Sequence, residues 1–384
     1  MEAILIILLF YFAFYMFYMV RLAMGIERVA GFGTTPVLRP VTTFTIIVPF
    51  RNEEEHLPRL LDSLAKMHYP RELFEVIFID DGSVDAGQSL VYRWRMKNGS
   101  LHATLLENIR RSGSPKKDAI SRAIPIATGD WIVTTDADCI VPEEWLKVLD
   151  QYVSRSGKRM IAGPVCYGES HGLAGIFQRH DLLAMQGATM GGFGLRKPFM
   201  CNGANFAYEK KLFHELGGFS GNESKPGGDD VFLLHKATAA GVNVAYLKCR
   251  QSIVVTKPES NWKSLVNQRV RWASKSTSYQ SSFAEEVALA VLFGNAAVLA
   301  LGVLAALQQV HWLFFALPFG MKFLVDWRIM AAANSLLKQQ RWLFPILSSV
   351  IYPIFTLIVA LLAMRGKYTW KGRKWASRGL RAGN

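Results

Sequence analysis

Cysteine is scarce in this sequence, and its spacing fits neither a disulfide framework nor a zinc site. The chain has four cysteines, which are far apart and form no CxxC pair: Cys139, Cys166, Cys201 and Cys249. We therefore expect buried free thiols in a reducing compartment. Internal repeats and low-complexity tracts are also absent, which argues against a repeat protein.

Charge is absent from the N-terminal run of residues 3–20. At about 1.5 Å per residue, a helix of this length crosses most of a bilayer. A cleaved signal peptide normally has a basic stretch before the run and a small-residue cleavage site after it, and the sequence lacks both. We predict a retained anchor over residues 1–24. Arg21, Arg28 and Arg39 follow, so the positive-inside tendency places the next region in the cytoplasm.

The composition is basic and apolar at once. The 384 residues are 51% hydrophobic and carry a formal net charge of +14. This pairing favours a membrane partner and predicts no nucleic-acid partner. Basic residues gather next to apolar segments, as in 365–381, where anionic headgroups would lie, although a solvated charged surface is the alternative.

The C-terminal region, residues 285–365, contains three apolar blocks at 287–307, 312–330 and 342–364, and a basic tail follows at 366–384. The first and last blocks read as clean membrane spans. The middle block carries Lys322, Asp326 and Arg328, which are costly in lipid unless they face protein or water. If the basic tail stays cytoplasmic, only two blocks cross, and the charged block is expected to be re-entrant or interfacial. The sequence thus leaves three or four spans, and two or three helices in this region.

Residues 25–284 are enough for one domain with a sizeable core. The segments 43–50, 74–83, 103–108 and 130–139 contain apolar strand-like runs that alternate with helical patterns, and polar residues collect where the runs end. This alternation predicts an α/β domain with a mostly parallel sheet, whose ligand crevice lies at the carboxyl ends of the strands.

Two of these runs end in acidic residues. Asp80 and Asp81 follow one run, and Asp136 and Asp138 follow another, separated by Ala137. Two carboxylates at this spacing suit a divalent cation whose remaining ligands are phosphate oxygens and water. A polar strand end without function is the competing interpretation of a short D-x-D triplet.

Six segments together resemble the membrane-bound family 2 glycosyltransferases, which have a GT-A fold. They cover residues 43–275 in the family's order: IIVPFRNEE, FIDDGSVD, PKKDAISRAIPIATGDWIVTTDADC, CNGANFAYEKKLFHELGGF, GGDDVFLLHKA and QRVRW. The tail segment YTWKGRKW is similar to the ending seen among ceramide, carotenoid and diacylglycerol glycosyltransferases.

The resemblance implies residues that bind a nucleotide-sugar donor, with UDP-sugar the expected donor. On the nucleoside side these are Pro49, Asn52, Glu53, Asp80 and Asp81. Carboxylates suit this task because they accept hydrogen bonds from the base N–H and the ribose hydroxyls, although Asp81 could instead cap a helix. Lys116 matches a basic residue of the family, but Pro115 stands where glycine is usual.

The resemblance also implies a metal and a general base. Asp136 and Asp138 match the family's D-x-D, so Mg²⁺ or Mn²⁺ on the donor diphosphate is the expected cofactor, with Asp138 the more direct ligand. Asp229 and Asp230 match the later acidic pair, whose second member is the base. An inverting transfer needs such a carboxylate to take the proton of the acceptor hydroxyl. A plain acidic helix start is the alternative.

The Q-x-x-R-W element lies before the second membrane block. By resemblance, its residues Gln268, Arg269, Arg271 and Trp272 bind the donor diphosphate and sugar. A juxtamembrane aromatic and basic belt is the alternative. The acceptor side is expected to include Asn202, Gly203, Asn205 and Trp272, with interfacial helices near 172–190 and 260–284. Lone histidines are more often structural than catalytic, so none is assigned a role.

The function implied is transfer of a hexose, with inversion, from a nucleotide diphosphate donor to a lipid hydroxyl. The expected location is a bacterial-type inner membrane, multi-pass, with the catalytic domain facing the cytoplasm and no obligate protein partner. A processive polysaccharide synthase remains an alternative because that class shares all six segments. A transporter or scaffold that only binds nucleotide sugars is the alternative from another class, and the charged block at 312–330 is what favours it.

Overall fold

The computed structural model describes residues 1–35, 39–223, 225, 227–274, 281–338 and 345–365, and the backbone of 367–370 and 373–376. The chain forms two compact units. One, the sheet unit, contains residues 30–168 and 200–257, and the other, the helical unit, contains 1–29, 169–199 and 258–384. Most of the predicted basic tail lies outside the described residues, apart from the antiparallel strands β10 (Lys367–Trp370) and β11 (Arg373–Ala376).

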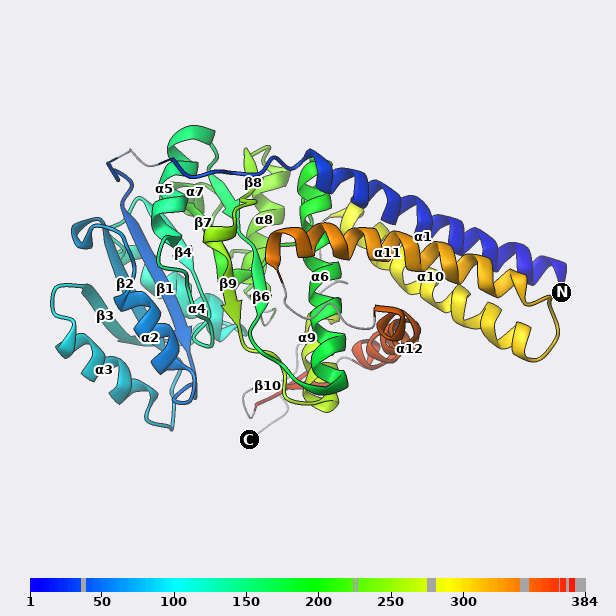
Figure 1. Cartoon of the computed structure of the whole chain (residues 1–384). Coiled ribbons are helices and arrows are strands. Elements are labelled where there is room, and N and C mark those ends of the chain that lie inside the picture. Colours follow the sequence, from blue (N-terminus) through cyan, green and yellow to red (C-terminus); the bar gives the residue numbers. More distant parts are fainter. Residues whose placement is uncertain are drawn as a thin grey trace. The chain divides into compact units, whose positions relative to one another are not determined.

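A seven-stranded sheet organises the sheet unit, in the order β3-β2-β1-β4-β7-β5-β8 (Figure 1). The first four strands of that order are parallel to one another: β3 (His102–Glu107), β2 (Phe74–Asp80), β1 (Phe44–Phe50) and β4 (Trp131–Thr134). The prediction of a mostly parallel α/β sheet is confirmed. Each predicted strand is present, although β4 stops at Thr134, short of the acidic residues that follow.

The strand β7 (Phe206–Glu209) is antiparallel to both of its neighbours, β4 and β5 (Met160–Ala162), and β8 (Val244–Tyr246) completes the sheet. Because β7 runs the opposite way, its beginning lies where β4 ends, and Phe206 pairs with Thr134. The segment before β7 is thereby brought to the carboxyl edge of the parallel strands. A separate parallel pair joins β6 (Val165–Tyr167) to β9 (Val254–Thr256).

Both faces of the sheet are buried, as expected for parallel strands covered by helices. Alternate side chains of β1, including Ile46 and Val48, join one apolar core with α2 (Leu57–Ala65), α3 (Gly87–Lys97) and α5 (Trp145–Ser156). The helix α4 (Pro115–Ala123) packs against β1 and β2. Two further helices, α7 (Lys210–Glu215) and α8 (Asp229–Ala239), follow β7 in the chain.

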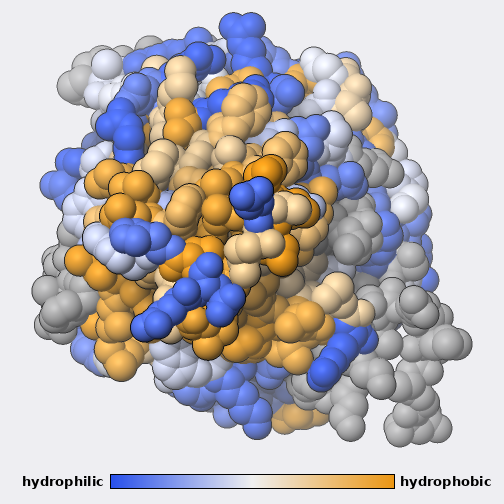
Figure 2. All heavy atoms as spheres, turned by 90° about the vertical axis from the view of Figure 1, so that its right-hand side faces the viewer, coloured by the Kyte–Doolittle hydropathy of each residue, from blue (hydrophilic) through white to orange (hydrophobic). Residues whose placement is uncertain are grey.

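The described residues of the helical unit form six α-helices. They are α1 (Glu2–Arg28), α6 (Gly172–Gly194), α9 (Trp262–Ala273), α10 (Ser282–Ala306), α11 (Leu313–Leu337) and α12 (Pro345–Met364). By length and composition, α1, α10 and α12 are apolar enough to cross a membrane. The charged block forms one uninterrupted helix, α11, which continues seven residues beyond the predicted end at residue 330. Figure 2 shows apolar side chains gathered on the face that looks along α1, α10 and α11.

Candidate active site

The carboxyl edge of the parallel strands carries the acidic residues that the sequence singled out. Asp80 ends β2, and Asp136 and Asp138 lie on the turn that follows β4, where the N–H of Cys139 donates to the carbonyl of Asp136 at 3.1 Å. Both turn carboxylates are half-buried. The parallel pairing of β1 with both β2 and β4 explains why residues 56 positions apart in sequence share one edge.

The side-chain ammonium of Lys116 lies between carboxylates of this edge. Its Nζ donates to Asp136 Oδ1 at 2.7 Å and lies 3.3 Å from Asp229 Oδ2. Burial alone would lower the pKa of Lys116, but the carboxylates of Asp136, Asp229 and Asp230 outweigh it and raise that pKa well above its usual value. Lys116 therefore stays a cation shared between the D-x-D turn and the later acidic pair.

The start of α8 supplies the acidic pair, and glycines shape its entry. Gly227 and Gly228 have positive φ angles of 71° and 68°, a conformation that glycine adopts without strain. Asp229 is buried, whereas Asp230 is half-buried and accepts a hydrogen bond of 2.7 Å from the N–H of Gly203. The two carboxylates thus differ in setting: Asp229 is paired with Lys116, and Asp230 remains partly accessible.

Gly203 lies at the centre of the group because β7 is antiparallel. Its carbonyl accepts a bond of 2.7 Å from Thr134 Oγ1, which fixes the segment beside the end of β4. A Cβ added to Gly203 would lie 3.2 Å from Lys116 Nζ and 3.3 Å from Asp229 Oδ2. A side chain at this position would therefore crowd the charged groups, and the structure brings together Lys116, Asp136, Asp229, Asp230 and Gly203. We call these five residues the lysine–aspartate cluster.

A divalent cation would find only part of its ligand set in the protein. Among the described residues, no three His, Cys, Asp or Glu side chains form a group that could hold a metal. The half-buried Asp136 and Asp138 offer carboxylate oxygens, which Mg²⁺ and Mn²⁺ prefer. The two residues fit a metal whose remaining ligands come from a bound diphosphate and water.

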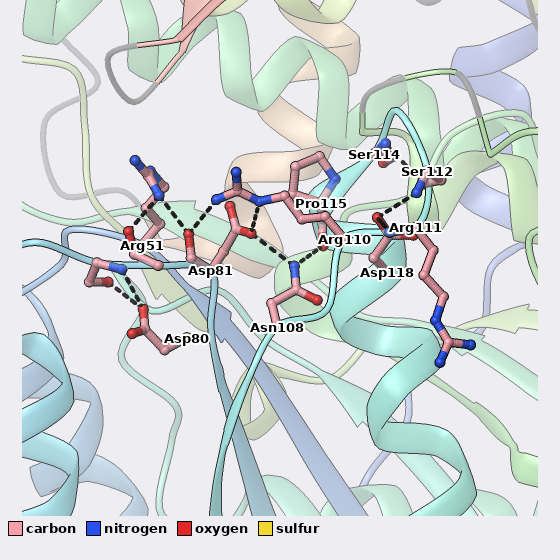
Figure 3. A network of polar contacts seen from close by, with 12 residues as sticks. Arg51, Asp80, Asp81, Asn108, Arg110, Arg111, Ser112, Ser114, Pro115 and Asp118 are labelled. Atoms are coloured by element: carbon pink, nitrogen blue, oxygen red, sulfur yellow. Dashed lines mark hydrogen bonds and ion pairs between the residues drawn. The ribbon is translucent and has the colours of Figure 1, made fainter.

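The residues predicted to bind the nucleoside take part in a network of polar contacts (Figure 3). Asp80 Oδ1 accepts bonds from the N–H and hydroxyl of Ser83 at 2.9 and 2.5 Å. Asn52, whose φ is 50°, binds the same turn through its side chain, which accepts from the N–H of Val84 at 3.0 Å. Pro49 is half-buried and precedes Phe50, the last residue of β1. The backbone carbonyl of Glu53 accepts from the N–H of His56 at 3.0 Å. The residues predicted to bind the nucleoside thus lie at the ends of β1 and β2 and on the segments that follow them.

Asp81 has partners that the sequence did not reveal. Its Oδ1 accepts bonds from Arg110 Nε at 2.8 Å and from Asn108 Nδ2 at 2.9 Å, both on the turn after β3 (Figure 3). Arg51 donates to the backbone carbonyls of Asp81 and Gly82, each at 2.6 Å. These hydrogen bonds from protein donors fix the position of the Asp81 side chain and its backbone carbonyl. Arg51 stands inside the first motif, but Arg110 and Asn108 follow an ordinary strand and carry no local signal.

A second lysine, which the sequence analysis did not assign to the site, anchors the segment before the acidic pair. Lys117 is 2% exposed, and its Nζ donates to the carbonyls of Asn222 at 2.7 Å and Lys225 at 3.1 Å. The ring of Phe232 in α8 lies 4.5 Å from the same Nζ. Burial lowers the pKa of Lys117 to about 8, and the nearby carboxylates of Asp229 and Asp230 oppose that shift. Ser114 adds another link by accepting from the N–H of Gly227 at 3.2 Å.

Two acceptor-side predictions differ in setting. Asn202 is half-buried, and its side chain accepts from the N–H of Ala204 at 3.0 Å. Asn205 is buried: its Nδ2 donates to the carbonyls of Pro164 and Ser252, each at 2.8 Å, and its Oδ1 accepts from Trp145 Nε1 at 3.0 Å. Asn205 therefore has a structural role, and its contact with an acceptor stays a prediction.

The Q-x-x-R-W residues belong to the helical unit, on α9. Arg269 forms a buried ion pair with Asp181 of α6 at 2.6 Å, and its guanidinium lies 4.3 Å from the ring centre of Trp272. Gln268 donates to Glu259 at 2.8 Å, and Arg271 occupies the last turn of α9. Donor binding by these four residues stays a prediction.

Comparisons with known proteins agree with this geometry. The family model described as Glycosyl transferase family 2 matches residues 45–217, which include β1, the D-x-D turn and the segment around Gly203. This match covers 173 of the 384 residues, so the chain resembles that family over this region. A mannosyltransferase of Pyrobaculum calidifontis, solved with GDP-Man and Mn²⁺, has a TM-score of 0.60 and 21% identity, and the match covers 88% of this chain and 99% of that one. The likeness shows that the chain has a fold of the GT-A type.

Curated relatives match parts of the chain. The poly(ribitol-phosphate) beta-N-acetylglucosaminyltransferase TarS of Staphylococcus aureus is 34% identical over 104 residues, 27% of this chain and 18% of TarS. The probable glycosyltransferase YdaM of Bacillus subtilis is 22% identical over 240 residues, 62% of this chain and 56% of YdaM. The chain thus spans between about a fifth and three fifths of these relatives. A specific likeness to lipid glucosyltransferases is not seen in them.

Proposed function

We propose that this protein transfers a sugar, with inversion, from a nucleotide diphosphate donor to the hydroxyl of a membrane lipid. The observation that carries the proposal is the lysine–aspartate cluster, in which one half-buried cation, Lys116, joins the D-x-D turn to the acidic pair at the start of α8. A protein that only binds nucleotide sugars has no need of both carboxylate groups beside one another. The proposal makes the D-x-D turn the donor side and Asp230 the base.

The donor diphosphate would lie at the D-x-D turn. Asp138 and Asp136 would hold a Mg²⁺ or Mn²⁺ ion there, and the ion would offset the charge that develops on the departing diphosphate. Lys116 is already placed to bring a positive charge to the same position. The mannosyltransferase of Pyrobaculum calidifontis was solved with GDP-Man and Mn²⁺, and TarS was solved with UDP-GlcNAc, so both nucleotides are candidates for this chain.

Asp230 is the carboxylate best placed to act as the base. Asp229 is buried and paired with Lys116, whereas Asp230 is half-buried and anchored by the N–H of Gly203. A base must reach the acceptor hydroxyl as that hydroxyl attacks the anomeric carbon opposite the leaving diphosphate. Asp229 would act through Lys116, by fixing its position.

A lipid acceptor is supported by the helical unit. Three of its helices are apolar enough to cross a membrane, and Arg21 and Arg28 follow the apolar part of α1. Attachment of the domain to a bilayer removes much of the translational cost of meeting a lipid hydroxyl. We place the sheet unit on the cytoplasmic side because of these arginines.

A polymer acceptor is the second candidate, and the similarity to TarS favours it. TarS is named for transfer to poly(ribitol-phosphate), and 104 residues of this chain match it at 34% identity. A soluble or wall-linked polyol chain would then replace the lipid.

The test is an assay of the purified full chain in lipid nanodiscs with Mn²⁺ or Mg²⁺ and a panel of UDP- and GDP-sugars. We expect release of nucleoside diphosphate and a lipid whose mass rises by one hexose. A mass gain on an added polyol-phosphate polymer, with unchanged lipids, would support the second candidate. Donor binding without turnover under any condition would contradict both.

A further inference from the structure

Three helices of the helical unit run side by side for their whole length. Figure 1 shows α1, α10 and α11 lengthwise, with the start of α1 and the connection from α10 to α11 at the same end. That connection is short, residues 307–312, so α10 and α11 are antiparallel neighbours. Each helix has at least 25 residues, about 37 Å at 1.5 Å per residue, which is enough to cross a bilayer. We call them the bundle.

The helix α6 crosses the bundle at one level. A Cβ on Gly187 of α6 would lie 2.5 Å from the Ile329 side chain of α11. One added to Gly191 would lie 2.5 Å from the carbonyl of Leu22 in α1, and one on Gly194 would overlap the carbonyl of Gly25. Successive residues of α6 thus meet different bundle helices, so α6 runs across them.

The charges of α11 lie in its second half, toward this crossing. Lys322 is 1% exposed and pairs with Asp326 at 2.5 Å, and Asp326 also accepts from the hydroxyl of Tyr15 in α1. Arg328 pairs with Glu27, near the end of α1. The preceding part of α11, residues 313–321, carries no charge. The charges that argued against membrane crossing are therefore neutralised within the bundle or lie toward its end, where polar groups are tolerated.

The helix α12 does not run with the bundle. Figure 1 shows α12 almost end-on, whereas α1, α10 and α11 are seen lengthwise. Its buried side packs on α6 and α9 and also contacts α10 of the bundle. The ring centres of Phe355 and Phe177 lie 4.8 Å apart, in one cluster with Leu265 and Val270, and Ser348 binds His180 at 2.6 Å. α12 is thus part of a layer of helices that cross the bundle.

The opposite side of α12 is an exposed apolar stripe along its length. The residues recur every three or four positions: Ile346, Val350, Ile354, Ile358 and Leu361. We call them the α12 stripe. Residues with this spacing lie on one side of a helix, so the α12 stripe is one continuous apolar surface along α12. Lipid acyl chains are the partner that fits it, because the exposed surface of the adjoining α1 and α10 is apolar as well.

We propose that α1, α10 and α11 cross the membrane, and that α12 lies along its surface with the α12 stripe in the acyl-chain region. Sequence alone predicts the reverse, with α12 crossing and the charged block at the surface. The orientation of the helices decides against that reading, because a helix that runs across the bundle cannot cross the bilayer with it. In-plane helices bury an apolar side at the boundary of headgroups and acyl chains.

The proposal determines on which side of the membrane each connecting segment lies. Three crossings by α1, α10 and α11 place the start of α12 on the side to which α1 leads, where the sheet unit follows in the chain. An in-plane α12 then leaves the basic tail on that same side. Only the connection at 307–312 and the start of α1 lie on the opposite side.

Cysteine labelling tests this topology. Single substitutions Ser100→Cys in the sheet unit, Gln309→Cys between α10 and α11, Lys338→Cys at the end of α11 and Asn384→Cys in the tail are made in the full chain. Ser335→Cys is a second position near the end of α11. A membrane-impermeant maleimide is applied to sealed vesicles of both orientations. Unsubstituted protein gives the background from native cysteines, and detergent-treated vesicles show that each cysteine reacts.

We expect Ser100→Cys, Lys338→Cys and Asn384→Cys to label in one vesicle orientation, and Gln309→Cys to label in the other. Labelling of Lys338→Cys and Ser335→Cys together with Gln309→Cys would overturn the crossing by α11. Labelling of Asn384→Cys opposite to Ser100→Cys would overturn the in-plane α12. The inference rests on the membrane attachment of the proposed function but not on sugar transfer. Protein that a carbonate wash releases from membranes would overturn the attachment, whereas a missing transferase activity would leave this result intact.

Discussion

Lys116 donates a hydrogen bond of 2.7 Å to Asp136, the first carboxylate of the D-x-D turn. The ammonium occupies an oxygen that a divalent cation would otherwise use. Because the same ammonium lies 3.3 Å from Asp229, it also connects the donor side to the acidic pair. In the proposed reaction, the pair Lys116–Asp136 would therefore link metal binding to turnover.

Replacing Lys116 should change metal binding and turnover in opposite directions. In Lys116→Met, Asp136 loses its cation, so a divalent metal should bind at lower concentration than in the wild type. Turnover should fall at least about 100-fold, as when one charge-stabilising group is removed from an active site. Metal titrations of binding and of nucleoside diphosphate release measure the two effects. Weaker metal binding in the variant would show that Lys116 does not compete for Asp136.

Arg51 should affect donor binding and leave the chemical step intact. It donates to the carbonyls of Asp81 and Gly82, so Arg51→Met should loosen the turn that holds Asp80. Losing hydrogen bonds from a charged donor costs about 1.5–3 kcal/mol, so KM for the donor should rise roughly tenfold or more, with kcat little changed. Steady-state kinetics and calorimetric titration with UDP or GDP measure this. A fall in kcat alone would contradict it. Arg111→Met, whose exposed side chain lies on the neighbouring turn, is the matched control.

Lys117 should make stability depend on pH. Its folded pKa is about 8, below the usual value of about 10.4, so the unfolded chain binds more protons between these two pH values. Stability rises with pH wherever the unfolded state binds more protons. The unfolding free energy of the wild type, relative to Lys117→Met, should therefore increase above pH 8, by at most about 1.4 kcal/mol per pH unit. Denaturation of both proteins from pH 7 to pH 10 measures the difference, and a constant difference would contradict this origin.

The ion pair between Lys322 and Asp326 in α11 allows two changes to be compared: removal of one charge and removal of both charges. Asp326→Asn leaves the Lys322 ammonium without its carboxylate and should destabilise the helical unit by about 3–5 kcal/mol. The double change Lys322→Met with Asp326→Leu removes both charges and should recover most of that loss. Thermal unfolding in detergent compares the three proteins. A double variant less stable than Asp326→Asn would show that the pair itself is required.

The sequence predicts the parts of the fold that depend on local pattern. The strand end at Asp80 and the turn that carries Asp136 just after β4 follow from apolar runs, and parallel pairing then brings them to one edge. The place of Gly203 did not follow from pattern, because it depends on β7 being antiparallel to β4. Its motif was found only through the family resemblance.

Contacts between distant segments were harder to foresee. Arg110 and Asn108 follow β3 and donate to Asp81, which follows the neighbouring strand β2. Lys117 donates to a carbonyl more than 100 residues away in the sequence. No local spacing encodes such contacts. The direction of α12 was equally hidden, since its composition is that of a spanning helix and only the arrangement of the helices in Figure 1 shows that it runs across the bundle.

The most direct test of the central claim compares Asp230→Asn with the wild type in nanodiscs, using Mn²⁺ and the donor that the wild type accepts. The amide keeps an oxygen for the Gly203 N–H but is no base, so nucleoside diphosphate release should fall about 100- to 10,000-fold while donor affinity stays unchanged. Glu223→Gln, an exposed carboxylate in the segment before α8, is the matched control and should keep wild-type turnover. Undiminished release by Asp230→Asn would contradict the assignment of this edge as the active site.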